Sequence, residues 1–182
     1  MYAKRVLAVI AVVAVSVLGG SAGAYGASKY LSSPIYVQEQ PNWCWVATSK
    51  SVIKFLTGAT PSQCTVYKWG KGTSSCPDGT GSFGADVANA LTNGGVWVGT
   101  MRSSTISFDS VKFELNANRP VMARWAWSGT AVGHVLVIRG FNDTGSALSF
   151  IDPEKSSYQV ASYSAFVSSG TRSWTHTRDG IS

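Results

Sequence analysis

Three residues of this sequence carry side chains that together suit nucleophilic catalysis: Cys44, His134 and Asp152. Cys44 follows Asn42, which we predict to be the N-cap of a helix, so that the thiol falls in the first helical turn. There the unpaired N–H groups and the positive end of the helix dipole favour a thiolate, which is the nucleophilic form. The same N–H groups can face a developing oxyanion. Placement at a helix start therefore favours a reactive Cys44 over a buried, inert thiol.

A thiolate nucleophile requires a base, and the sequence contains only 2 histidines. His134 follows a glycine and directly precedes the apolar run VLVIRGF, which is typical of a rigid central strand. We therefore expect His134 at the mouth of that strand. His176 lies near the end of the chain, in WTHTRDGIS, and is the less favoured candidate.

The hairpin that follows His134 provides a candidate for the group that orients the base. A hairpin centred on Thr144 places Leu136 opposite Asp152. His134 then lies one pleat further out on the same face, because side chains alternate along a strand. At that register Asp152 can accept the imidazole N–H and fix its tautomer, whereas a bulge would break the inference. The alternative for Asp152 is an ordinary turn residue before a proline.

An oxyanion hole needs a second donor besides the backbone N–H of Cys44. Gln38 and Gln40 lie six and four residues before Cys44, and either side-chain amide can donate. Taken alone, each is better explained as an ordinary surface glutamine. The choice between the two stays open.

The other two cysteines, Cys64 and Cys76, lie in a segment rich in turn residues, CTVYKWGKGTSSCPDG. A disulfide between them would close a loop of about 13 residues and contribute roughly 3 kcal/mol in the loop-entropy view. The alternative is a zinc site formed by both cysteines with His134 and His176, but its spacing fits no familiar zinc pattern. We therefore expect no metal, and without a Gly-rich phosphate loop in the sequence we expect no cofactor.

The elements that must position these residues are predicted as helices first and strands afterwards. Ser82 and Ser107 are the expected caps of the second and third helices. The helices are expected at residues 43–57, 83–92 and 108–116. Short apolar or aromatic runs after Pro120 predict strands at residues 121–127, 135–141, 147–151, 158–163 and 172–178. This order favours an α+β fold over alternating β-α units.

The composition indicates a single packed domain, because 45% of the 182 residues are hydrophobic and only 13% are charged. A net charge of +6 without long runs of like charge does not favour nucleic acid as a partner. We divide the chain into a signal peptide at residues 1–24, a flexible leader at 25–33 and one domain at 34–182.

Residues 1–24 have the layout of a secretory signal peptide. Lys4 and Arg5 form a basic start, an apolar run follows, and Ala22-Gly23-Ala24 offers a cleavage site. The apolar run is short for a membrane span, which needs about 20 residues, although an uncleaved N-terminal anchor is the alternative. We expect a secreted, extracellular protein with no stable membrane association after signal cleavage.

The segment VQEQPNWCWVA resembles the active-site segment of papain-like cysteine peptidases, in which a glutamine precedes the nucleophile by six residues and Cys-Trp opens the central helix. The strings PVMARWAW, GHVLVIRGF and FIDP resemble the β-domain of the same clan. The likeness is to its compact bacterial branch, which includes avirulence-type effector proteases of plant pathogens. It extends over roughly residues 38–153, and Asp152 stands where many clan members have asparagine.

The resemblance implies a helical half, whose central helix carries Cys44, packed on an antiparallel sheet or half-barrel. It implies a peptidase that acts on a protein or peptide through an acyl-enzyme on Cys44. We expect the protein to be a monomer. His134 would serve as base and acid, and Asp152 would orient it. Gln38 and the Cys44 N–H would bind the oxyanion.

Two other kinds of function fit the same residues. A Cys-His-Asp site also suits a murein peptidase or amidase, or an acyltransferase, and a basic extracellular protein suits an anionic cell wall. A catalytically silent binding module with a tryptophan-lined sugar face is the non-enzymatic alternative. Most tryptophans lie within or beside predicted elements, so we expect these in the core or the cleft wall: Trp43, Trp45, Trp97, Trp125 and Trp127.

Overall fold

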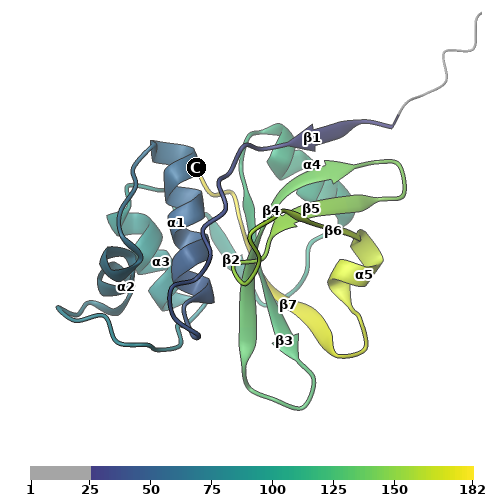
Figure 1. Cartoon of the computed structure of the whole chain (residues 1–182). Helices are drawn as coiled ribbons and strands as arrows, with labels where there is room; N and C mark the ends of the chain where they lie inside the picture. The colour runs from purple at the N-terminus through teal and green to yellow at the C-terminus, as the bar shows by residue number, and fades with distance from the viewer. Residues whose placement is uncertain (1–25) are drawn as a thin grey trace, which may run out of the picture.

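The computed structural model describes residues 26–182, in which helices pack on both faces of one antiparallel sheet (Figure 1). The fold is α+β, as the order of predicted elements indicates. The predicted signal peptide at residues 1–24 lies outside the described residues. No helix within residues 26–182 is long and apolar enough to cross a membrane. The elements are β1 (Ser28–Tyr30), α1 (Cys44–Thr57), α2 (Gln63–Lys71), α3 (Ala85–Asn93), β2 (Thr100–Arg102), α4 (Phe108–Asn116), β3 (Val121–Trp127), β4 (Gly133–Asn142), β5 (Ala147–Ile151), β6 (Gln159–Ser162), α5 (Tyr163–Val167) and β7 (Arg172–Asp179).

The central strands of the sheet are β3 and β4. The strand order is β2-β7-β3-β4-β5-β6, and β1 pairs with the last residues of β4 beyond the end of β3. β4 pairs with β3 over residues 133–138, with β5 over residues 137–142 and with β1 over residues 140–142, so both of its edges are paired only in its second half, and its sequence GHVLVIRGFN is buried almost throughout. His134, near the start of the strand, is positioned by its pairing with Trp125 of β3.

The two faces of the sheet bury two separate hydrophobic cores. Helices α1, α2 and α3 cover one face, where Ile53 packs with Val137. Helices α4 and α5 cover the other face, where Phe166 packs with Leu136. Neighbouring residues of β4 thus enter different cores, as the two-residue period of a strand requires. Burying each of these large side chains contributes about 1.5–3 kcal/mol.

Several predicted elements have the expected bounds. α4, β3 and β5 begin and end at the predicted residues, and Ser107 caps α4 through a bond from the Ser110 N–H. α3 begins two residues later than predicted, because Phe83 packs into the first core before the helix starts. Ser82 nonetheless accepts a bond from the Ala85 N–H at this helix start.

Two helices occupy segments where the sequence pattern predicts none. α2 lies in the segment interpreted as a turn-rich loop, with Ser62 accepting the Thr65 N–H at its start and Gly72 ending it at a φ of 65°. α5 begins at Tyr163, the last residue of the predicted strand 158–163, directly after β6, and is capped by Ser162. Both helices begin with a serine cap, a signal that the loop-like composition around them concealed.

The interpretation of residues 25–33 as a flexible leader is wrong from Ser28 onward. Residues 28–30 form β1, and Tyr30 pairs with Gly140 of β4. Leu31 is buried, and its backbone exchanges hydrogen bonds with the backbone and side chain of Arg139. Residues 28–30 show no helical or alternating pattern. They form a strand because the edge of β4 at residues 140–142 is free to pair with them, and the local sequence does not reveal that edge.

The tryptophans divide between the core and the surface. Trp43, Trp45 and Trp125 are buried, as expected. Trp127 is half exposed at the end of β3. Trp97 is 70% exposed, so its predicted place in the core or the cleft wall is wrong. It lies after α3, where its backbone pairs with that of Ser182 and its ring stays outside.

Candidate active site

Cys44 is the first residue of α1 and is partly exposed. The predicted N-cap, Asn42, is wrong, because the cap residue is Trp43 and no side chain bonds to the helix start. Asn42 instead donates its backbone N–H and its side-chain amide to the carboxylate of Asp78, at 3.0 and 2.9 Å. The thiol still falls in the first turn, where N–H groups point toward an anion and the helix dipole is positive.

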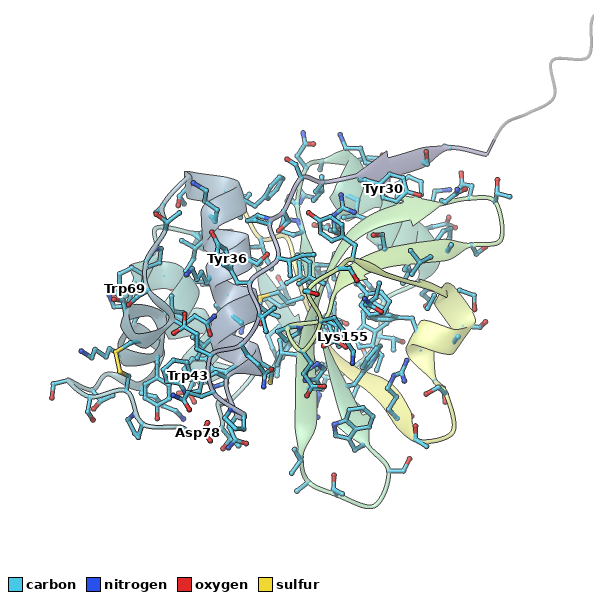
Figure 2. All side chains as sticks on the ribbon, in the orientation of Figure 1. Tyr30, Tyr36, Trp43, Trp69, Asp78 and Lys155 are labelled. Carbon is cyan, nitrogen blue, oxygen red and sulfur yellow. A yellow bond between two sulfur atoms is a disulfide. The ribbon has the colours of Figure 1, made fainter. Side chains whose placement is uncertain are left out.

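A loop from the helical half holds the start of α1. The indole N–H groups of Trp43 and Trp45 donate to the carbonyls of Pro77 and Gly79, each at 3.2 Å. Figure 2 shows Trp43 and Asp78 at the same end of α1, and Cys44 is the first residue of this helix. The loop therefore fixes both the direction and the position of the helix start.

The predicted disulfide between Cys64 and Cys76 is confirmed, with an S–S distance of 2.05 Å. It joins α2 to Cys76, the residue just before Pro77, whose carbonyl accepts the indole N–H of Trp43 at the cap of α1. The disulfide thus anchors the loop that holds the nucleophile. It also removes both cysteines from the zinc site considered above.

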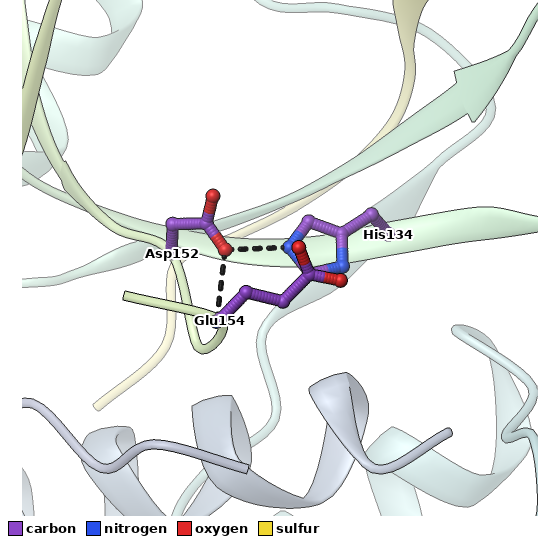
Figure 3. A group of neighbouring side chains, drawn as sticks. All are labelled: His134, Asp152 and Glu154. Carbon is purple, nitrogen blue, oxygen red and sulfur yellow. Dashed lines mark hydrogen bonds and ion pairs between the residues drawn. The ribbon is translucent and has the colours of Figure 1, made fainter. Parts of the chain in front are cut away.

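His134 lies at the second residue of β4 and is only 5% exposed. Its ring Nε2 is 2.7 Å from Oδ1 of Asp152, and the same oxygen accepts the backbone N–H of Glu154 at 3.0 Å (Figure 3). The rings of Trp125 and Trp127, both on β3, each lie 6.5 Å from the imidazole centre. The imidazole is thus bonded to one carboxylate and lies near two indole rings.

The register of the β4–β5 hairpin brings this pair together. Near the turn, Asn142 pairs with Ala147, one residue out of the predicted register. A β-bulge before Gly140 removes the offset, so that Val137 pairs with Ile151, as the hairpin centred on Thr144 predicts. The shifted turn and the bulge cancel each other. Asp152, the residue directly after β5, therefore lies next to His134 near the start of β4.

Charge stabilises the protonated ring of His134. Burial by itself lowers the pKa of His134, but hydrogen bonds with Asp152 and Cys44 and the negative charge on both outweigh it and raise the pKa to about 9. For Asp152, burial alone raises the pKa, whereas bonds from His134 and from the Glu154 N–H bring the pKa below its usual range. At neutral pH the pair is an imidazolium beside a carboxylate.

Cys44 and His134 line the same cleft, which encloses about 350 Å³. The helical wall includes Trp45 and the loop residue Gly81, and the sheet wall includes Trp127 at the end of β3. Sequence reasoning had not assigned two charged residues that also line it, Arg124 and Glu154. A thiol and an imidazole thus line one cleft, whose volume suits a short peptide segment.

Gln38 and Gln40 are not among the residues that line this cleft. The side-chain amide of Gln38 donates to the carbonyls of Gln40 and Pro41, at 3.2 and 2.7 Å, and its Oε1 is buried without a partner among the described residues. The backbone N–H of Gln38 donates to the carbonyl of Pro153, next to Asp152, at 2.9 Å. This segment therefore touches the sheet side of the site.

Gln63 of α2 clamps the same segment, and sequence reasoning did not find it. It is 2% exposed. Its Oε1 accepts the backbone N–H of Glu39 at 3.1 Å and its Nε2 donates to the carbonyl of Val37 at 2.7 Å. The Gln63 amide thus bonds to one backbone N–H and one backbone carbonyl, as a neighbouring strand would. It holds the backbone on both sides of Gln38. No local pattern marks a buried glutamine 25 residues away in the chain.

His176 lies apart from this arrangement. It is on β7, outside the lining of the cleft, with Nδ1 2.9 Å from Oγ1 of Thr175. Burial and the charge of Arg124 lower the pKa of His176, so the ring is neutral at pH 7. Its position does not suit a partner of Cys44.

One group of side chains has the composition of a metal site. Donor atoms of His134, Asp152 and Glu154 lie within 4.8 Å of one another (Figure 3). The His134 nitrogen and the Asp152 oxygen are already engaged with each other at 2.7 Å, and the Glu154 side chain is exposed. The hydrogen-bonded pair explains the proximity of these groups without an ion.

Comparison with known proteins gives a consistent result. Residues 27–171 match the protein family described as "Papain-like cysteine protease AvrRpt2". No curated protein sequence matches the chain. Among solved structures, the fold is similar to that of xylellain, a cysteine protease from Xylella fastidiosa, with a TM-score of 0.54 and 12% sequence identity over 86% of this chain and 87% of that one. At that identity the likeness concerns the fold.

Proposed function

The chain belongs to the family of AvrRpt2-type papain-like cysteine proteases and is a cysteine-type peptidase, and we propose that Cys44, His134 and Asp152 are its catalytic residues. The observation that carries the proposal is the position of His134. Its ring is bonded to Asp152 on one side and interacts with the Cys44 side chain, within a cleft large enough for substrate. This is the order of nucleophile, base and orienting group that thiol catalysis requires.

The reaction then has two balanced steps. The Cys44 thiolate attacks the scissile carbonyl carbon, and as the C–N bond breaks His134 gives its proton to the leaving amine. Water next attacks the thioester, His134 takes a proton from it, and the C–S bond breaks to release the acid and the thiolate. Asp152 holds the ring orientation throughout and offsets its positive charge.

Backbone N–H groups at the start of α1 are suited to bind the oxyanion, since no side chain caps them. Gln38 would be the second donor, with Gln40 as the alternative. For Gln38 this requires its amide to turn from the carbonyls of Gln40 and Pro41 to the substrate. Hydrogen bonds of catalytic groups often form only when substrate binds, and we expect the Gln38 amide to turn at that step.

We further propose that the protein is exported. The layout of residues 1–24 supports this, as does the disulfide between Cys64 and Cys76, since structural disulfides are rare in reducing compartments. Mass spectrometry of protein secreted by an expressing cell, read for a mature start near residue 25, tests the export.

The catalytic proposal is tested by labelling the native, unreduced protein with an epoxide-type thiol reagent and mapping the adduct by mass. We expect rapid labelling near neutral pH at Cys44 alone, with Cys64 and Cys76 still joined. Cys44→Ala should abolish both the label and peptide hydrolysis with an unchanged circular dichroism spectrum. Slow labelling or residual turnover at a substantial fraction of the parent rate would overturn the mechanism.

Substrates of two kinds, peptides and muropeptides, are tested side by side with the same preparation. We expect cleavage of peptides built only from L-amino acids. Turnover confined to muropeptides would assign the same triad to murein hydrolysis, and transfer to an added amine in place of water would assign it to acyl transfer.

A further inference from the structure

The cleft contains a cation that the proposed mechanism does not use. Arg124 is the fourth residue of β3 and lines the cleft together with Cys44 and His134. In the sheet it pairs with Val135, and the next residue of β3 pairs with His134 itself. Because all three side chains line one cleft, Arg124 lies close to the reacting groups although it does not pair with His134.

The guanidinium group lies against the backbone just before His134. An added Cβ at Gly133 would lie 2.5 Å from both Cζ and Nε of Arg124, so the glycine leaves the space that the guanidinium fills. Its two terminal nitrogens donate to Oγ1 of Thr175 and to the carbonyl of Ala131, at 3.2 and 3.3 Å. These bonds fix the group in the wall and leave N–H donors free, since a guanidinium has five.

Four arginines have no acidic partner among residues 26–182, namely Arg124, Arg139, Arg172 and Arg178, and of these only Arg124 lines the cleft. Arg102 forms an ion pair with Asp179, and Arg119 one with Glu114. Among residues 26–182, no carboxylate lies within ion-pair distance of Arg124. A fixed, uncompensated guanidinium in a cleft is a site for a carboxylate, which it can bind with two parallel bonds.

The surroundings strengthen such a contact. The exposed side chains of Trp127 and Val132, 36% and 56% accessible, line the cleft beside Arg124. Substrate packing against them would exclude water, and charge pairs are stronger where water is excluded. An extended peptide advances about 3.3–3.6 Å per residue, so a carboxylate at Arg124 belongs to a residue within about three positions of the scissile bond.

We propose that Arg124 binds an acidic side chain of the substrate, so that the enzyme prefers peptides with Glu or Asp close to the bond it cleaves. This rests on the proposed peptidase function. In this proposal Arg124 selects substrates by the charge of a side chain near the scissile bond, whereas the catalytic residues determine only the reaction.

The test uses pairs of fluorogenic peptides that differ only by Glu or Gln at one position, scanned over three positions on each side of the scissile bond. We expect the wild-type kcat/KM to favour Glu over Gln by about tenfold or more at one position, as for a hydrogen bond to a charged group. Added salt should reduce that preference.

Two variants at Arg124 sharpen the test. Arg124→Met keeps the aliphatic stem over Gly133, and we expect it to lower kcat/KM for the Glu peptide to that for the Gln peptide, which itself changes little. Arg124→Glu should invert the preference toward a Lys peptide. Lys54→Met is the matched control: it removes one positive charge ten residues beyond Cys44, about 15 Å along α1, and should keep the ratio.

The outcomes separate the two proposals. Equal cleavage of all Glu and Gln peptides by the wild type, or a Glu preference that survives Arg124→Met, overturns the acidic subsite and leaves the peptidase function in place. Cleavage of no peptide at all, with Cys44 unreactive toward the epoxide, overturns both. If Arg124→Met does not fold, the wild-type ratio and its salt dependence decide.

Discussion

The two sides of the cleft are built by different kinds of contact. On the sheet side, His134 and Asp152 are placed by the backbone ladders of β4 with β3 and β5, so that strand register determines where the two side chains meet. On the helical side, the start of α1 is held by side chains bonded to a loop and by the disulfide that anchors this loop.

This difference predicts how each side fails. A backbone ladder has many weak members, and replacing one side chain leaves the register unchanged. The helical side depends on a few bonds between residues far apart in the sequence, so that losing one bond shifts or loosens the nucleophile. Variants on the sheet side should therefore change the chemistry, and variants on the helical side should change stability and positioning.

On the sheet side, the largest effect is expected from His134→Ala. Because no other imidazole lies in the cleft, we expect kcat/KM for peptides to fall on the order of 10³-fold or more, with the sheet intact. Peptide kinetics with circular dichroism as a control measures both. A decrease in kcat/KM of less than about tenfold would show that the reaction does not need the His134 ring.

Asp152→Asn should have the next largest effect and should show itself in the pH profile. The wild-type imidazolium persists until the pH rises through about 9, so kcat/KM should fall above that pH. The substituted amide would keep a bond to the ring but remove the negative charge that raises the pKa of His134, so the upper limb should move to lower pH, toward 6.5. Activity at pH 7 should fall about tenfold. If the upper limb of the pH profile does not move, Asp152 does not control the pKa of His134.

The free energy of unfolding should also depend on the protonation of His134. A ring whose pKa is raised on folding stabilises the native state fully below its unfolded pKa of 6.5 and loses that contribution as the pH rises through about 9. Urea unfolding of the wild type between pH 6.5 and 10 should show this loss. Asp152→Asn should flatten it.

The disulfide provides the test of the helical side. Replacing Cys64 and Cys76 together by serine should lower the free energy of unfolding by roughly 3 kcal/mol, measured with urea. Amide exchange should increase first in the loop at residues 77–81 and at the start of α1, and later in β3 and β4. Uniform exchange over both sides would remove the distinction between them.

The same contrast explains how much the sequence could reveal. The β4–β5 turn and the alternation of β4 are local patterns, so the hairpin and the facing of His134 and Asp152 could be predicted, although a bulge and a shifted turn had to cancel. The disulfide followed from the cysteine count. These inferences rest on neighbours in sequence or on residue types that are rare in the chain.

The remaining contacts could not be predicted because they join distant segments. Asn42 is a good helix cap by its type, yet Asp78 bonds both of its donors. Ser28 to Tyr30 become a strand only because β4 extends beyond β3. Arg124 was placed within a strand by its pattern, but only the fold shows that it lines the cleft without an acidic partner.

Gln63 offers a finer test of the helical side. Gln63→Ala removes both bonds to the backbone around Gln38, and we expect a lower free energy of unfolding by about 1–3 kcal/mol and a kcat about tenfold lower. Gln63→Glu keeps the acceptor for the Glu39 N–H but cannot donate to Val37, and should not restore kcat. Gln159→Ala, on the edge strand β6, is the control that should change neither quantity. If KM rises while kcat is unchanged, the clamp does not position the oxyanion segment.

The smallest effect is expected from His176→Ala. The ring lies on β7 against Thr175 and Phe83, outside the cleft, and burial together with the charge of Arg124 lowers its pKa and keeps it neutral at pH 7. Peptide kcat/KM should therefore stay within about twofold of the parent. A ring with a lowered pKa contributes stability above its ordinary value of 6.5 that is lost as the pH falls, so this variant should lose less stability in acid than the wild type. Since the chain has only 2 histidines, a loss of activity comparable to that of His134→Ala would assign the base to β7 and place the chemistry on the other edge of β3.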